Sequence, residues 1–180
     1  MGQIRVAPAT ADTWPHLRGL FGRSGADNGC WCQYWLLGAE YHRRDRSRNR
    51  DDLEAQVRTG GVGFLAYRDD TAVGWARVTP RHELDWLTSR FRLDEADDPL
   101  AVACFYIARS ERGTGIMTAL LEAAVAHARS AGVSLEVYPI DDAVQGATRN
   151  RFSGVLPAFI RAGFVEVDRL SADRALVRAV

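Results

Sequence analysis

The stretch Leu100–Leu121, LAVACFYIARSERGTGIMTALL, decides which fold the chain is expected to adopt. Its first eight residues are continuously apolar, as is typical of a β-strand buried on both faces. After ARSERGTG, apolar residues recur at helical spacing from Met117, and Gly132 is placed to end that helix. The stretch therefore predicts a buried strand, a glycine-rich turn and a helix reaching residue 131.

The glycine-rich turn has a chemistry of its own. Gly113 and Gly115 would leave several backbone N–H groups exposed at the start of the helix, where those groups and the helix dipole attract anions. Arg112 adds a positive charge there, and Thr114 can cap the helix or donate a hydroxyl hydrogen bond to a phosphate. Taken alone, Gly-x-Gly is equally compatible with a phosphate cradle and with a turn that holds no ligand.

The flanking sequence supplies the rest of a mixed sheet. Alternating segments at 62–68 and 72–78, joined by Asp-Asp-Thr, predict a β-hairpin. Further strands are expected at 3–6, 133–138, 164–167 and 175–180, and helices at about 12–23, 51–58 and 155–162. CWCQYWLL is left unassigned, and polar or acidic loops are expected at 93–98 and 140–153. The expected fold is α/β (α+β), with a mostly antiparallel central sheet, helices on both faces and a single domain over residues 1–180.

Composition limits the classes of function. Acidic and basic residues balance at 23 each, which argues against a general polyanion binder, so no nucleic-acid partner is expected. The arginine-rich HRRDRSRNR run is flanked by acidic residues and is interpreted as a solvated approach to a helix. Every basic residue is arginine, which suggests a bacterial genome rich in G and C. Without lysine, a Schiff base and a GxxxxGK[ST] phosphate loop are both excluded.

The spacing of the three cysteines, Cys30, Cys32 and Cys104, indicates no disulfide framework. Three cysteines are also too few for an all-cysteine zinc site, so no metal is expected. CWCQYW is interpreted as aromatic packing, with metal or redox chemistry as the alternative, and Cys104 as a small core residue. Because no apolar run is long enough to act as a signal core or to span a bilayer, a cytoplasmic protein with reduced thiols and no membrane partner is expected.

A dinucleotide-binding fold is the first rival interpretation. Gly113 and Gly115 could begin a GxGxxG motif, with Glu136 as its ribose-binding acid. The third glycine position is Thr118, and only about 40 residues follow Glu136. Both facts disfavour this fold.

The turn resembles that of the GNAT superfamily of N-acetyltransferases. Their pattern is a strand ending in an aliphatic residue, here Ile107, then R/Q-x-x-G-x-G/A opening a helix, here Arg112-Gly-Thr-Gly115-Ile-Met117. AFIRAGF at 158–164 and the hairpin are also similar to that family. The resemblance implies acetyl-CoA as the acyl donor, with its thioester where the strands at 100–107 and 133–138 diverge. The CoA-binding residues that it implies are Phe105, Tyr106, Ile107, Arg112, Gly113, Thr114, Gly115, Ile116 and Met117.

Three positions depart from the family pattern. Met117 stands where a small residue is usual, and Leu100-Ala101 where an acidic base sometimes lies. Phe159 occupies the place of a tyrosine that commonly protonates the leaving thiolate, and phenylalanine carries no proton to give. Tyr138 is the substitute candidate acid, and Glu136 and Asp141 are candidate bases. Each has a competing interpretation, as a packed tyrosine or as a solvated acid. Residues proposed to wall the acceptor pocket are Trp31, Tyr34 and Trp35.

The expected function is acetyl-CoA-dependent N-acetylation of an unidentified amine, a small molecule or a protein, by direct transfer. The alternative is a non-catalytic acyl-CoA-binding sensor or regulatory protein of the same fold. A third reading is an interaction protein whose glycine turn binds nothing. The sequence does not decide whether the chain forms a homodimer.

Overall fold

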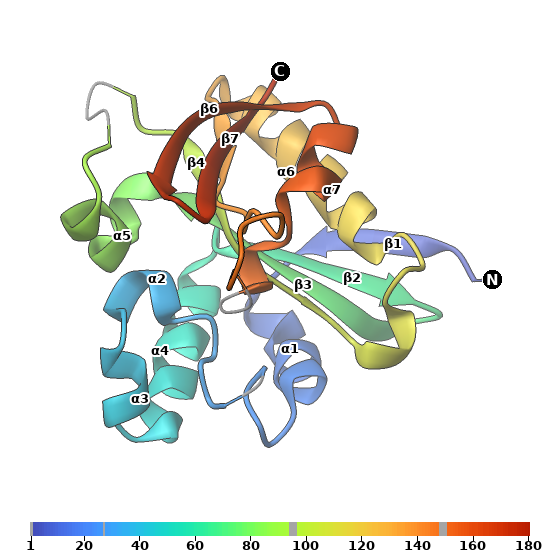
Figure 1. Cartoon of the computed structure of the whole chain (residues 1–180). Coiled ribbons are helices and arrows are strands. Elements are labelled where there is room, and N and C mark those ends of the chain that lie inside the picture. Colours follow the sequence, from blue (N-terminus) through green and yellow to red (C-terminus); the bar gives the residue numbers. More distant parts are fainter. Residues whose placement is uncertain (1, 27, 94–96, 148–150) are drawn as a thin grey trace.

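The computed structural model describes residues 2–26, 28–93, 97–147 and 151–180, and these form one seven-stranded sheet (Figure 1). Its strand order is β1-β2-β3-β4-β5-β7-β6, with β4 and β5 parallel and the other neighbours antiparallel. The strands are Ile4–Pro8 (β1), Gly63–Arg68 (β2), Thr71–Pro80 (β3), Leu100–Ile107 (β4), Leu135–Val137 (β5), Phe164–Ser171 (β6) and Arg174–Ala179 (β7). The mixed, mostly antiparallel sheet expected from the sequence is confirmed.

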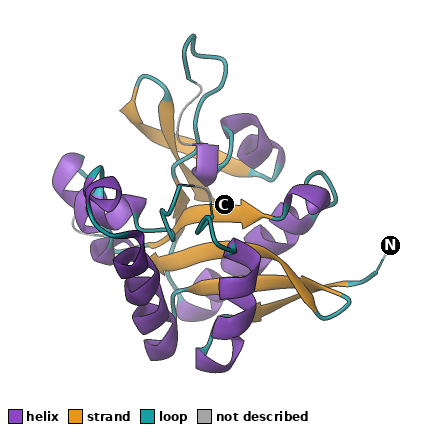
Figure 2. Ribbon diagram, turned by 90° about the horizontal axis from the view of Figure 1, so that it is seen from below, coloured by secondary structure: helices purple, strands orange, loops and turns teal. Residues whose placement is uncertain are grey.

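Helices cover both faces of the sheet, as Figure 2 shows. The helices are Trp14–Phe21 (α1), Tyr34–Leu37 (α2), Glu40–Arg43 (α3), Arg46–Thr59 (α4), Asp85–Arg90 (α5), Ile116–Ala131 (α6) and Leu156–Arg161 (α7), and the 3-10 turns are Ala11–Thr13, Arg81–Glu83, Arg109–Glu111 and Arg151–Ser153. α6 and α7 pack on one face through apolar side chains of β2–β5, and α1 and α4 pack on the other. A third cluster joins α2 and α5 to the sheet near the start of β4. Each face of the sheet therefore buries its own core.

The central unit predicted from the sequence is present with small changes of length. β4 runs from Leu100 to Ile107, as expected. The next strand was predicted too long, because β5 covers Leu135–Val137 and pairs with β4 only over Leu100–Val102 in the described part of the chain. Beyond Val102 the two strands diverge, and this divergence positions the site described below.

The charged segment after residue 40 is more helical than expected. The helix predicted at 51–58 is too short, because α4 begins at Arg46. Asp45 caps it by accepting a 2.8 Å hydrogen bond from the Ser47 N–H, and the buried Asn49 amide donates to the carbonyls of Gly29 and Tyr41 at 2.8 and 2.9 Å. Polar contacts therefore stabilise the N-terminal part of this helix, ahead of the buried Leu53 and Val57.

Other boundaries need smaller corrections. The first helix is shorter than expected: α1 starts at Trp14 after a 3-10 turn and ends before Gly22, whose φ is 60°. The unassigned CWCQYWLL segment contains α2. The hairpin turn is confirmed, with Asp69 and Asp70 both in the left-handed region at φ 47° and 64°. The expected loops at 93–98 and 140–153 fall partly outside the described residues.

Candidate active site

The turn before α6 presents the start of that helix to the surface. Gly113 and Gly115 have φ values of 77° and 90°, which side chains with a Cβ rarely adopt. Gly115 is the N-cap of α6, and no side chain caps the helix. Of the two roles considered for Thr114, capping the helix is therefore not observed. Because Gly115 is exposed, the positive end of the helix dipole, where the first N–H groups of a helix have no partner within the helix, lies at the surface.

Arg68 on β2 braces this turn. Its guanidinium donates to the Glu111 carboxylate at 2.9 Å, to the Thr114 hydroxyl at 3.1 Å and to the Gly2 carbonyl at 2.7 Å. The Thr114 hydroxyl in turn donates to the Glu111 carbonyl at 2.7 Å. Sequence reasoning missed Arg68, because it lies 43 residues from Glu111 and belongs to no local motif. The turn is thus held in shape from the neighbouring sheet.

A cavity of about 540 Å³ joins the turn to the edge of β4. Arg112 and Met117 border it at the helix end, Phe105–Ile107 border it along the strand, and Cys32 and Cys104 border it further along. Arg112 is exposed, and its Nε donates to the Ile107 carbonyl at 3.3 Å. Gly113, Thr114, Gly115 and Ile116 make up the turn itself, with the Ile116 side chain buried in the core. Most of the CoA-binding residues implied by the resemblance therefore lie together around one space.

Met117 fits this site through its flexible side chain. It is half-buried against the core, and its Cε lies 3.1 Å from where a Cβ on Gly154 would be. Phe159 is fully buried and packs against Phe105 and Phe164, with ring centroids 6.2 and 5.7 Å away. Phe159 therefore contributes packing behind the cavity and no ionisable group.

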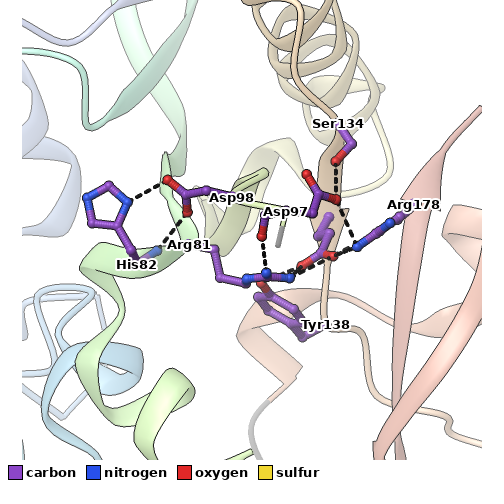
Figure 3. Close-up of polar contacts among 8 residues, drawn as sticks. Arg81, His82, Asp97, Asp98, Ser134, Tyr138 and Arg178 are labelled. Carbon is purple, nitrogen blue, oxygen red and sulfur yellow. Dashed lines mark hydrogen bonds and ion pairs between the residues drawn. The ribbon is translucent and has the colours of Figure 1, made fainter. Parts of the chain in front are cut away.

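Two of the predicted catalytic residues lie in a buried charged cluster, drawn in Figure 3. Glu136 has no exposed surface and accepts hydrogen bonds from Arg81 at 3.2 Å and from Arg178 at 2.7 and 2.9 Å. The Tyr138 hydroxyl donates to the same carboxylate at 3.1 Å. Burial, followed by the charge of Glu136, raises the pKa of Tyr138 well above its ordinary value. Neither Glu136 nor Tyr138 borders the 540 Å³ cavity.

The third candidate, Asp141, follows the end of the β5 segment. Its carboxylate forms an ion pair with Arg169 at 2.8 Å and accepts a hydrogen bond from the Ala143 N–H at 3.2 Å. Asp141 does not border the cavity either. None of the three candidates is therefore among the residues that line the cavity beside Phe105–Ile107.

The three aromatic residues proposed for the acceptor pocket lie in different places. Trp31 packs between α1 and the sheet and borders a second cavity, of about 680 Å³. Trp35 is buried and donates from Nε1 to the Ser153 hydroxyl at 3.3 Å. Tyr34 is half-buried and packs against Phe152, which borders the 540 Å³ cavity, at a centroid distance of 4.9 Å. Trp35 also packs against Phe152, at a centroid distance of 6.2 Å, so both Tyr34 and Trp35 contact a residue that borders that cavity.

Metal binding and membrane spanning are two further properties that the described residues bear on. Among the described residues, no group of three or more histidine, cysteine, aspartate or glutamate side chains is arranged to hold a metal ion. In the same part of the chain, no helix combines the length and the apolar character needed to cross a bilayer.

Comparisons with known proteins agree with this geometry. A family model described as the acetyltransferase (GNAT) family matches residues 31–149. A search of curated proteins gave no match. Similar solved structures include a Corynebacterium glutamicum protein described as histone acetyltransferase HPA2 and related acetyltransferase, at TM-score 0.60 and 18% identity over 99% of this chain and 95% of that one. The GNAT domain of S. lividans PAT gives TM-score 0.60 and 18% identity over 98% and 90%. The PaiA N-acetyltransferase of Thermoplasma acidophilum, in complex with coenzyme A, gives 0.57 and 12% over 98% of both chains. At these identities the structures establish the fold.

Proposed function

The chain belongs to the GNAT acetyltransferase family, and from this we propose that acetyl transfer takes place in the cavity beside residues 112–117. As a member of the family it is an acetyl-CoA-dependent N-acetyltransferase whose acceptor is an amine. The observation that carries the proposed location is the uncapped, exposed start of α6, which opens beside the same cavity as Phe105–Ile107. Membership in a family of enzymes does not favour the alternative of a non-catalytic acyl-CoA sensor.

We propose that the pyrophosphate of CoA binds the N–H groups of residues 113–117, with Arg112 adding its positive charge. Arg68 supports this role because it fixes the turn from behind through Glu111 and Thr114. The pantetheine would lie along Phe105–Ile107, and its thioester near the point beyond Val102 where β4 and β5 diverge. Backbone N–H groups of β4 would then stabilise the oxyanion that forms as the amine attacks.

The reaction requires two proton transfers, from the amine and to the departing thiolate. An alkylammonium must lose its proton before attack, which costs roughly 4–5 kcal/mol at neutral pH. Phe159 has no proton to give to the departing thiolate. We propose that Tyr138 and Glu136 serve mainly to hold the strands, because their polar atoms bond to each other and to arginines away from the cavity. The role of Asp141 as a general base stays a prediction.

Several finer features remain predictions from the sequence. These are a single domain over residues 1–180, bacterial origin, location in the cytoplasm, the absence of nucleic-acid and membrane partners, and the open possibility of a homodimer. Trp31, Tyr34 and Trp35 as acceptor-pocket residues belong with them. Tyr34 and Trp35 are supported by their contacts with Phe152, which borders the cavity.

A binding and turnover experiment tests the proposal. Acetyl-CoA and CoA should raise the melting temperature of the wild-type chain, and a screen of amines should reveal release of the CoA thiol. Arg112→Gln should reduce the shift in melting temperature, whereas Arg129→Gln, at the opposite end of α6, should leave it unchanged. An equal reduction in both variants would contradict the proposed position of the pyrophosphate.

A further inference from the structure

Two buried cysteines from distant parts of the sequence meet beside the proposed acyl-donor site. Cys32 lies in the segment before α2 and Cys104 in the middle of β4, and their Sγ atoms are 2.8 Å apart. Both side chains belong to the core between the sheet and the helices α1 and α4. The two thiols therefore need little movement to react with each other.

The surroundings of Cys32 favour a thiolate. The Trp75 indole N–H donates to its Sγ at 3.2 Å. Arg77 pairs with Cys104 in the β3–β4 register, so both of their side chains project from the same face of the sheet. Arg77 is 1% exposed, its Nη1 donates to Gln56 at 3.0 Å, and its Nε has no hydrogen-bond partner among the described residues. A buried guanidinium with a free donor is thus placed close to the two sulfur atoms.

The three cysteines differ in their tendency to ionise. Burial alone raises the pKa of Cys32, but its hydrogen bond with Cys104 and the Arg77 charge more than offset this and hold that pKa below its ordinary value. The hydrogen bond to Cys32, with burial, raises the pKa of Cys104 well above its ordinary value. Burial raises the pKa of Cys30 to about 12, so Cys30 stays a thiol at neutral pH. Cys32, whose Sγ also accepts from the Trp75 indole N–H, is therefore the better nucleophile of the pair.

Small molecules have a route to this pair. Cys32 and Cys104 are only 4% and 8% exposed, yet both border the 540 Å³ cavity that also reaches the exposed Arg112. An oxidant of the size of hydrogen peroxide fits such a space, whereas a folded protein does not. The ligand class is thereby limited to small electrophiles.

We propose that Cys32 and Cys104 form a reversible disulfide site for a hydroperoxide. The Cys32 thiolate attacks one peroxide oxygen, the O–O bond breaks, and hydroxide leaves and is protonated to water, so that Cys32 becomes a sulfenic acid. The Cys104 sulfur then attacks the Cys32 sulfur, the S–O bond breaks, and a second water departs with the Cys104 proton. Two thiols are oxidised to one disulfide and one hydrogen peroxide is reduced to two waters. A dithiol reductant reverses the reaction by thiol–disulfide exchange.

The disulfide has a consequence for acetyl transfer, and this part rests on the proposed function. It ties the segment before α2 to β4, across 72 residues of sequence, at the end of the cavity proposed for the thioester. In the disulfide neither sulfur atom can carry a negative charge that would offset the nearby Arg77 guanidinium. The oxidised chain should therefore lose acetyl transfer and regain it when dithiothreitol is added.

The test begins with the full chain and hydrogen peroxide, in the absence of acetyl-CoA. Oxidation should remove two of the three free thiols, lower the intact mass by two hydrogen atoms, and join the peptides that contain Cys32 and Cys104 under non-reducing conditions. Cys30→Ser should still form this cross-link, whereas Cys32→Ser and Cys104→Ser should not. A Cys30–Cys32 bond, oxygen adducts without a cross-link, or no reaction at all would each overturn the dithiol site.

A second measurement separates this proposal from the proposed function. If the cross-link forms but acetyl-CoA does not stabilise the reduced chain, the proposed location of acetyl transfer is contradicted. The proposal of a dithiol site is then retained. If the reduced chain is active and the cross-linked chain is equally active, the regulatory consequence is overturned. A melting temperature that rises on oxidation and falls again with dithiothreitol would show that the cross-link forms within the native fold.

Discussion

Individual residues with unusual backbone geometry carry the proposed CoA site. Gly115 at φ 90° directs the first N–H groups of α6 outward, and Gly132 at φ 69° ends the same helix. The two glycines share the left-handed region, but only Gly115 lies at the proposed site. They therefore form a matched pair for separating stability from binding.

We expect Gly115→Ala and Gly132→Ala each to lower the free energy of unfolding by about 1 kcal/mol, because a Cβ is disfavoured in the left-handed region. Only Gly115→Ala should also weaken acetyl-CoA binding, by roughly tenfold in Kd, because relief of the strain turns the N–H groups away. Chemical denaturation and calorimetric titration measure the two effects. Equal affinities in the two variants would argue against phosphate binding at this turn.

A pH effect is expected at His82 and Asp98. His82 Nδ1 lies 2.6 Å from the Asp98 carboxylate, and this hydrogen bond and the charge of Asp98 raise the pKa of His82 in the folded chain (Figure 3). A raised folded-state pKa adds stability that is fully present below the unfolded value of about 6.5 and is lost as pH rises through the folded value.

Asp98→Asn should therefore lower the melting temperature more at about pH 5.5 than at about pH 8.5. The Asp98 carboxylate also accepts from the His82 N–H at 3.2 Å, so a smaller, pH-independent loss is expected at both values. Thermal melts of wild type and variant across this range measure the difference. A loss that does not change with pH would show that the ion pair adds nothing.

At the scale of elements, β3 and α6 approach each other through a glycine. A Cβ on Gly74 would lie 2.4 Å from Ile116 Cγ2 and 3.2 Å from Leu120 Cδ1. Ile116 directly follows Gly115, so the packing of β3 against α6 sets the height of the proposed phosphate site above the sheet. The packing of β3 against α6 is thereby expected to influence the binding of acetyl-CoA.

Gly74→Ala should cost about 1–3 kcal/mol of stability through overpacking, and it should weaken acetyl-CoA binding by displacing the start of α6. Gly19→Ala serves as the control, because the new Cβ in helix α1 meets no described atom within 4 Å. That substitution should stabilise the chain by about 0.5–1 kcal/mol and leave binding unchanged. Unaltered binding in Gly74→Ala would mean that α6 adjusts without moving its first turn.

At the scale of the whole molecule, the Glu136 cluster joins strands on both sides of the point where β4 and β5 diverge. Glu136 is on β5, Arg178 is on β7, and Arg81 follows β3. Asp97 extends the cluster, accepting from Ser134 at 3.2 Å and pairing with Arg178 at 3.2 Å (Figure 3). The cluster thus stabilises the paired stretch of β4 and β5, next to the point beyond Val102 where the two strands diverge.

Glu136→Ala should lower the free energy of unfolding by about 3–5 kcal/mol, because it removes a fully buried carboxylate that accepts hydrogen bonds from Arg81, Arg178 and Tyr138. Glu166→Ala removes a more exposed partner of Arg169 on β6 and should cost at most about 1 kcal/mol. Urea denaturation of both variants measures the contrast. Similar losses would show that the buried cluster contributes no more than a surface ion pair.

Local patterns in the sequence determined the central unit of the fold. An apolar run of eight residues has to be buried on both faces, and glycines before a 3.6-residue period have to form a turn at a helix start, so β4, the turn and α6 follow from neighbouring residues. The hairpin at Asp69-Asp70 follows in the same way. The start of α4, before residue 51, escaped prediction, because the Asp45 cap and the buried Asn49 amide stabilise it there and no apolar residue precedes Leu53 in that helix.

Tertiary structure alone decided which side chains meet. Arg68 reaches Glu111 across 43 residues of sequence, and Cys32 reaches Cys104 across 72. It also placed Glu136 and Tyr138 in a buried ionic cluster, where the sequence suggested a candidate base and a candidate acid. The physical reason is that periodicity and capping act within one or two turns of chain, whereas such partners are set by strand order and register, which depend on how the whole core packs.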